Sequence, residues 1–147
     1  MWDIEEIPNE SIVFTRIHKD FVSNQDGLPK KTAFQNTPHI GGIDLSCDWD
    51  KYCTPQSSRE IISKEKNKKG EFKNNLDFFI WAFPVLKIRQ IDNPTQAVLH
   101  RPIYHDPEIE GLPNNRAHSG IFGEKPVNDA KFRTKILRAG QWAISPQ

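Results

Sequence analysis

Apolar and polar residues alternate along several short stretches of the chain, a pattern that predicts β-strands because successive strand residues point to opposite faces. The first such stretch covers residues 11–18. On one face Ile12 and Phe14 are followed by the polar residues Arg16 and His18, whereas the other face stays mostly apolar. We therefore expect a strand whose first face runs from the core into a polar end.

Similar runs, separated by turn residues, predict further strands. Residues 78–83 are apolar on both faces, so this strand should lie centrally in a sheet. Residues 48–52 should form a turn, and residues 101–115, with three prolines and a glycine, a long loop. The other strand candidates are residues 43–47, 85–91, 95–100, 117–122 and 142–144, the last being either a closing strand or a docked segment.

Capping residues predict two helices. Thr54 can cap a helix over about residues 54–66, with Pro55 at the first helical position, where its missing N–H costs nothing. Asn128 can cap a second helix over about residues 127–139. Because the helices are segregated from the runs of strands, we expect one α+β domain with a mixed or mainly antiparallel sheet and two principal helices.

The charge balance excludes a generally basic protein. Lys and Arg number 20 and Asp and Glu 19, so any contact with nucleic acid or an anionic membrane must be local. No stretch reaches the roughly 20 apolar residues of a membrane span, and residues 1–8 lack the pattern of a signal peptide. Cys47 and Cys53 lack the spacing of a zinc or disulfide framework. We expect a cytoplasmic protein with reduced thiols, no membrane contact, no metal and no cofactor.

The most basic stretch of the sequence follows the first predicted helix. Residues 64–70 contain four lysines among seven residues. Such a tract is typical of a solvated helix end and loop, because exposed lysines are well hydrated and suit the negative end of a helix. We prefer that interpretation to a phosphate-binding patch.

An arginine two residues before a histidine occurs twice, as Arg16 with His18 and as Arg116 with His118. If the two segments are neighbouring strands, both imidazoles would face one pocket. His18 and His118 could then act as base and acid on a phosphodiester, with Arg16 and Arg89 as anion-binding residues. This arrangement suits metal-independent cleavage of RNA, and the same groups could instead bind the pyrophosphate of NAD without cleaving it.

Simpler interpretations of these residues stay open. An arginine or histidine at a strand end can bond carbonyl groups or pair with an acidic side chain, and Arg116 can point to solvent. The sequence predicts neither a serine nor a cysteine nucleophile. It has no GxSxG motif, and neither Cys47 nor Cys53 has a base at a diagnostic spacing.

Four short segments of the chain read FTRIH, KTAF, DLSCD and NRAH, at residues 14–18, 31–34, 44–48 and 115–118. Their arrangement resembles a group of small, uncharacterised bacterial proteins. These proteins have an R-I-H start, an S-x-A-F step, an L-S-V-(D) strand and an N-P-A-H segment near the C-terminus. The resemblance implies a bacterial cytosolic protein associated with defence or other conflict systems, and it implies no particular activity.

Two hypotheses of function follow from the sequence. The first is an accessory binding or interaction module of a bacterial multi-gene system, which has a protein partner. The second is a small metal-independent enzyme that acts on a phosphodiester or nucleotide, RNA or NAD, through His18 and His118. The enzyme hypothesis requires the two imidazoles to face one pocket within reach of a single phosphate.

Overall fold

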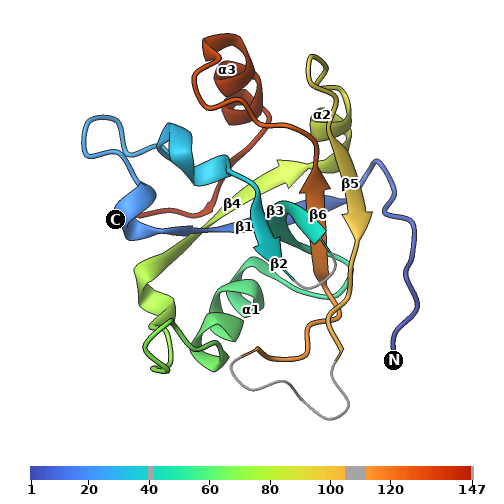
Figure 1. The fold of residues 1–147 in the computed structure, drawn as a ribbon, viewed down its shortest axis with the longest axis vertical. Coiled ribbons are helices and arrows are strands. Elements are labelled where there is room, and N and C mark those ends of the chain that lie inside the picture. Colours follow the sequence, from blue (N-terminus) through green and yellow to red (C-terminus); the bar gives the residue numbers. More distant parts are fainter. Residues whose placement is uncertain (40–41, 105–111, 147) are drawn as a thin grey trace.

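A computed structural model describes residues 1–39, 42–104 and 112–146. Its centre is a seven-stranded sheet with the strand order β5-β6-β3-β1-β4-β7, and β2 pairs with β3 outside this path (Figure 1). Every strand pairing is antiparallel, which confirms the predicted α+β class. The strands are β1 (Ile12–His18), β2 (Thr37–His39), β3 (Gly42–Trp49), β4 (Phe78–Pro84), β5 (Ala97–His100), β6 (His118–Phe122) and β7 (Gln141–Ile144).

The two faces of this sheet differ in chemistry because each strand alternates its side chains. On one face, side chains such as Val13, Trp49 and Phe83 join a single buried cluster with the helices behind them. We call it the apolar face. Phe14 lies opposite Asp48 in the register of β1 and β3, on the other face of the sheet.

The second face is the polar face. Asp48 of β3 also lies opposite His118 of β6, so these two side chains share it. Ser46 is two residues from Asp48 on β3, and Arg16 is two residues from Phe14 on β1, so both side chains lie on the polar face too. Three strands distant in sequence therefore bring an arginine, a serine, an aspartate and a histidine to one surface.

The helices lie on opposite sides of the sheet. In Figure 1, α2 (Val85–Arg89) and α3 (Ala130–Arg138) lie above the strands and α1 (Pro55–Glu60) lies below them. Phe132 and Ile136, one turn apart on α3, are both buried in the cluster of the apolar face. The short helix α1 packs on the polar face, where the Ser58 hydroxyl bonds the Asp48 carboxylate.

The predicted N-cap is observed at α1, and at α3 the N-cap lies one residue later than predicted. Thr54 forms a capping box with Ser57, and Pro55 begins α1 as predicted. The helix is shorter than expected, since α1 ends at Glu60 and a 3-10 turn, Ile61–Lys64, replaces its continuation. At α3 the cap is Asp129, which accepts bonds from two backbone N–H groups, and not Asn128.

Two local predictions were wrong. Residues 85–91 were expected to alternate as a strand, but Val85–Arg89 is helical and buries Val85 and Ile88, which are three residues apart on one helix face. Pro84 ends β4 and has no N–H, so the chain can turn into a helix there. Asp48 and Trp49, predicted in a turn, are the last two residues of β3. Among the described residues, no helix is both long and apolar enough to cross a membrane.

Candidate functional site

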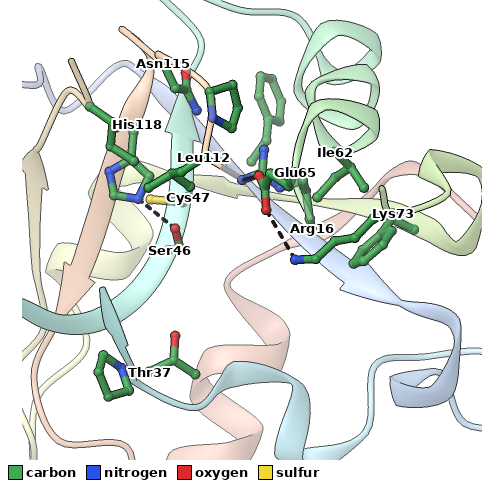
Figure 2. A pocket seen from close by; sticks show the side chains of 15 residues that line it. Arg16, Thr37, Ser46, Cys47, Ile62, Glu65, Lys73, Leu112, Asn115 and His118 are labelled. Atoms are coloured by element: carbon green, nitrogen blue, oxygen red, sulfur yellow. Dashed lines mark hydrogen bonds and ion pairs between the residues drawn. The ribbon is translucent and has the colours of Figure 1, made fainter. Parts of the chain in front are cut away.

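The polar face of the sheet forms one wall of a cavity of about 360 Å³. The cavity is bordered on the other sides by the segment after α1 and by Ile103, Leu112, Pro113 and Asn115, and it is open to solvent. Figure 2 shows Ser46 and His118 on one side of it and Glu65 and Lys73 on the other. Its polar lining residues are Arg16, Thr37, Ser46, Glu65, Lys73, Asn115 and His118, and the other lining residues are Phe14, Pro38, Cys47, Ile62, Phe78, Ile103, Leu112 and Pro113.

A serine and a histidine are directly hydrogen-bonded in this cavity. Ser46 Oγ lies 2.7 Å from His118 Nε2 (Figure 2). His118 is 2% exposed, whereas Ser46 is half-buried and stays open to the cavity. The pair is therefore a rigid imidazole that holds an accessible hydroxyl.

The other nitrogen of His118 determines which atom of the pair donates. His118 Nδ1 lies 2.7 Å from the backbone carbonyl oxygen of Arg101. A carbonyl only accepts, so Nδ1 carries the proton and donates it. In a neutral imidazole Nε2 is then the acceptor, and the Ser46 hydroxyl donates to it. This is the orientation in which a histidine can remove the proton of a serine, with a backbone carbonyl where many hydrolases use an aspartate.

Arg16 is held beside this pair by a buried carboxylate. Arg16 Nη1 donates to Asp48 Oδ2 at 2.8 Å and to the Ser58 carbonyl at 3.1 Å. Asp48 also accepts from Ser58 Oγ at 2.6 Å and from Asn115 Nδ2 at 2.9 Å. The carboxylate is only 2% exposed, and these contacts satisfy it and fix the direction of the arginine.

A second carboxylate lies between the two cations of the cavity. Glu65 Oε2 is 3.6 Å from Arg16 Nη2, and Glu65 Oε1 is 3.2 Å from Lys73 Nζ (Figure 2). Lys73 is one-third exposed and Arg16 is mostly buried, so two cations, each paired with a carboxylate, line the cavity from the sheet towards solvent. Cations in such a position stabilise negative charge that develops on a reacting group.

Gly120 makes space for the packing under the site. It lies opposite Ser46 in the register of β3 and β6. A Cβ atom at this position would lie 1.7 Å from Asp44 Oδ2, which is far closer than any contact allows. A glycine is therefore required there if the buried Asp44 carboxylate, two residues from Ser46 on the same strand face, is to lie over this position.

Neither cysteine is suited to act as a nucleophile. Burial raises the pKa of the Cys47 thiol well above its usual range, and Cys47 lies in the core cluster of the apolar face. Burial also raises the pKa of Cys53 to about 12. Because the reactive form is the thiolate, both thiols are inert near neutral pH, and both are free as expected.

The structure brings two of the four predicted site residues together. Arg16 and His118 line the same cavity. His18 lies in a neighbouring hollow, which shares Arg16 and Ser46 with the first, and its Nδ1 accepts from the Asp20 N–H. Arg89 lies elsewhere, with its guanidinium donating to the Asn9 side chain and the Val98 carbonyl.

Arg116, the second arginine of the paired motif, does not enter the cavity lining. Its guanidinium lies 4.3 Å from the centroid of the Tyr52 ring, and the residue is exposed. The contact is a cation–π interaction at the surface. Arg116 therefore lies at the surface, as in the alternative that it points to solvent.

Sequence reasoning missed Ser46 as the partner of His118. The signal was the alternation in Leu45–Asp48, which places Ser46 and Asp48 on one strand face, but residue 48 was assigned to a turn. Asn115 was quoted only as part of a short motif, whereas His118 was predicted as a catalytic residue. Glu65 and Lys73 carried no local signal, because a bend in the chain brings them to the cavity.

Comparison with known proteins gives no further assignment. The chain matches no protein-family model, no curated protein and no solved structure at a significant level. Within the ranges that the structure describes, no group of three or more His, Cys, Asp and Glu side chains could hold a metal ion. The function is therefore argued from the cavity.

Proposed function

We propose that this chain is an enzyme that cleaves an ester bond, with Ser46 as the nucleophile and His118 as its general base. The observation that carries the proposal is the 2.7 Å contact between Ser46 Oγ and His118 Nε2 at the wall of an open cavity. The bond from His118 Nδ1 to the Arg101 carbonyl supports it, because it leaves Nε2 free of a proton.

The proposed reaction has two displacement steps. The Ser46 oxygen bonds to the electrophilic carbon or phosphorus of the ester, and its proton passes to His118 Nε2. The ester bond to the leaving alcohol breaks, and His118 returns the proton to that oxygen. Water then attacks the covalent intermediate and gives a proton to His118. The bond to the Ser46 oxygen breaks and His118 returns this proton to that oxygen, so no atom is lost or left over.

The phosphodiester or nucleotide expected from the sequence is the ester class that the cavity favours. Arg16 and Lys73 are the cations of its lining, and both would face the charge on a phosphoryl group. His18 lines the adjoining hollow and would contact a substrate only where it extends beyond Ser46. In this proposal Ser46 replaces His18 as the group that works with His118.

A serine-directed fluorophosphonate reagent tests the proposal directly. Covalent labelling of Ser46, located by peptide mass spectrometry, is expected for the wild-type chain. We expect Ser46→Ala to abolish the labelling and His118→Ala to slow it by about 100-fold or more, as for loss of a general base. Ser63→Ala is a matched control, because Ser63 is exposed and its hydroxyl donates to the Glu60 carbonyl.

Folding has to be separated from chemistry in this experiment. Ser46→Cys retains a nucleophile of similar size, so it should react with iodoacetamide faster than the buried Cys47. Wild-type protein that is folded, by circular dichroism, and is not labelled at Ser46 would refute the proposal. So would equal labelling of Ser46 and Ser63.

The accessory binding module stays a prediction beside this proposal, as do the protein partner and the association with a defence system. A binding module would use its surface and not the Ser46–His118 pair. Labelling of Ser46 that leaves the hydroxyl of Ser63 untouched would favour the enzyme over the module.

A further inference from the structure

The lysine-rich tract after α1 is exposed along most of its length, as expected of a solvated helix end and loop, and it is folded as a hairpin. Residues 64–73, which we call the lysine hairpin, fold back so that Lys66 bridges to Phe72 in antiparallel fashion. The Lys73 N–H donates to the Glu65 carbonyl at 2.9 Å, and Asn67 Oδ1 accepts from two N–H groups of the turn. These bonds hold the backbone of the tract, so the lysines project from a defined turn.

The lysine hairpin concentrates positive charge that the chain as a whole does not have. It contains five lysines and two glutamates, in a chain whose formal net charge is +1. Lys68 and Lys69 are exposed at its tip, and within the described part of the chain neither makes an ion pair. Such a local excess is the electrostatic feature that attracts a polyanion.

An exposed aromatic ring lies among these lysines. Phe72 is 64% exposed, and Lys66 Nζ lies 5.4 Å from the centroid of its ring. Unpaired nucleobases stack on such rings, and this contact is tolerant of sequence because every base has a π-face. Lysines near an exposed ring can therefore bind the phosphates of a single-stranded nucleic acid while the ring stacks on its bases.

The lysine hairpin also leads into the cavity. Glu65 and Lys73, at its two ends, line the cavity that contains Ser46 and His118. A nucleic-acid strand bound along the hairpin would continue towards Ser46 and His118. The surface of a bilayer is flat and could not enter the cavity. The position of the hairpin therefore favours a nucleic acid over an anionic membrane.

We propose that the lysine hairpin binds single-stranded nucleic acid and directs one of its phosphodiesters to Ser46. This inference rests on the proposed function for the reaction, but the binding it describes can be measured without any reaction. The substrate is then a nucleic-acid polymer and not a free nucleotide. RNA and DNA share the phosphate and base chemistry on which the argument depends.

Fluorescence anisotropy with labelled ten-nucleotide RNA and DNA tests the binding. We expect the inactive Ser46→Ala chain to bind at least one of them, with an affinity that falls as salt rises. Replacing Lys68 and Lys69 by Ala should weaken binding about tenfold or more at low salt and lower the salt dependence. Phe72→Ala should weaken it about fivefold for every sequence tested.

A matched control removes the same charge from the opposite side of the sheet. Lys131 and Arg138 are exposed on α3, which covers the apolar face. Replacing both by Ala should change the affinity less than twofold. Circular dichroism of each variant should match the parent, since all substituted side chains are exposed.

Three outcomes would overturn the inference. They are no binding of either oligonucleotide at about 100-fold excess over the protein, equal losses in the hairpin and α3 variants, and tighter binding to anionic phosphatidylserine vesicles than to the oligonucleotides. Each is independent of the fluorophosphonate result. The reaction proposed at Ser46 and the binding proposed at the hairpin can therefore fail separately.

Discussion

The two faces of the sheet are built from the same strands but satisfy different requirements. The apolar face buries side chains such as Val13, Ile121 and Phe83 completely against α2 and α3. The polar face buries the charged or polar side chains of Asp48 and His118 nearly as deeply, beside a cavity. The apolar face stabilises the fold by removing apolar surface from water, whereas the buried groups of the polar face are stabilised by hydrogen bonds.

This difference shows where the chain accepts a cost in stability. A buried ion pair contributes little to stability, because its desolvation offsets the attraction between the charges. A fold that needed only stability would place apolar side chains at Arg16 and Asp48. Their presence beside the Ser46–His118 pair is therefore better explained by a function at the polar face.

The comparison predicts unequal costs for the same truncation on the two faces. Phe83→Ala should lower the free energy of unfolding by about 3–5 kcal/mol, because Phe83 is fully buried on the apolar face. Phe14→Ala should cost about half of this, since Phe14 lines a cavity that already leaves part of the ring without partners. Urea unfolding of both variants measures the difference, and equal costs would contradict the contrast between the faces.

Alternation along the strands was sufficient to predict much of the apolar face from the sequence. It placed β1, β3, β5 and β6 within a few residues, because a buried face imposes a period of two on the residues that form it. It failed at residues 85–91, where Val85 and Ile88 satisfy both a strand and a helix pattern. Pro84 decides between them in the folded chain.

The polar face could be predicted only in part, for a physical reason. Its side chains are held by partners from distant segments, such as Ser58 on Asp48 and Arg101 on His118. No local pattern records a contact between residues 10 or more positions apart. Arg16 and His118 were found because a charged or polar residue in an apolar run stands out, whereas Ser46 looks ordinary in any strand.

Removing one partner of the buried pair tests whether the polar face depends on pairing. Asp48→Asn should lower the free energy of unfolding by about 3 kcal/mol, because Arg16 keeps its charge and loses the closer and more buried of its two counterions, Glu65 being the other. The double variant with Arg16→Met should cost less than the sum of the two single changes. Thermal unfolding of the three variants gives the coupling energy.

The exposed ion pair of Lys19 and Asp77 is the control for this cycle. Its atoms lie 3.3 Å apart, but both side chains are at least one-third exposed. Asp77→Asn should cost less than about 1 kcal/mol, because water screens the pair. If Asp48→Asn cost no more than Asp77→Asn, burial of the Arg16–Asp48 pair would not increase the cost of breaking it.

A smaller effect than that of Asp48→Asn is expected from a lysine buried where β6 ends. Lys125 Nζ donates to the Asn36 side chain and to the carbonyls of Ile121 and Gly123. Burial lowers the pKa of Lys125 to about 8, although the Asp44 carboxylate acts in the opposite direction. The ammonium group is therefore less favourable in the folded chain than in the unfolded chain.

The sign of the resulting pH dependence follows from proton binding. Between about pH 8 and the unfolded pKa of about 10.4, the unfolded chain binds more protons, so stability rises with pH across this window. We expect the free energy of unfolding to increase by about 1–2 kcal/mol from about pH 7.5 to about pH 9.5. Lys125→Met should lack this increment in urea unfolding at the two pH values. An identical rise in both chains would assign it to other groups and would leave the burial of Lys125 without a measurable cost in stability.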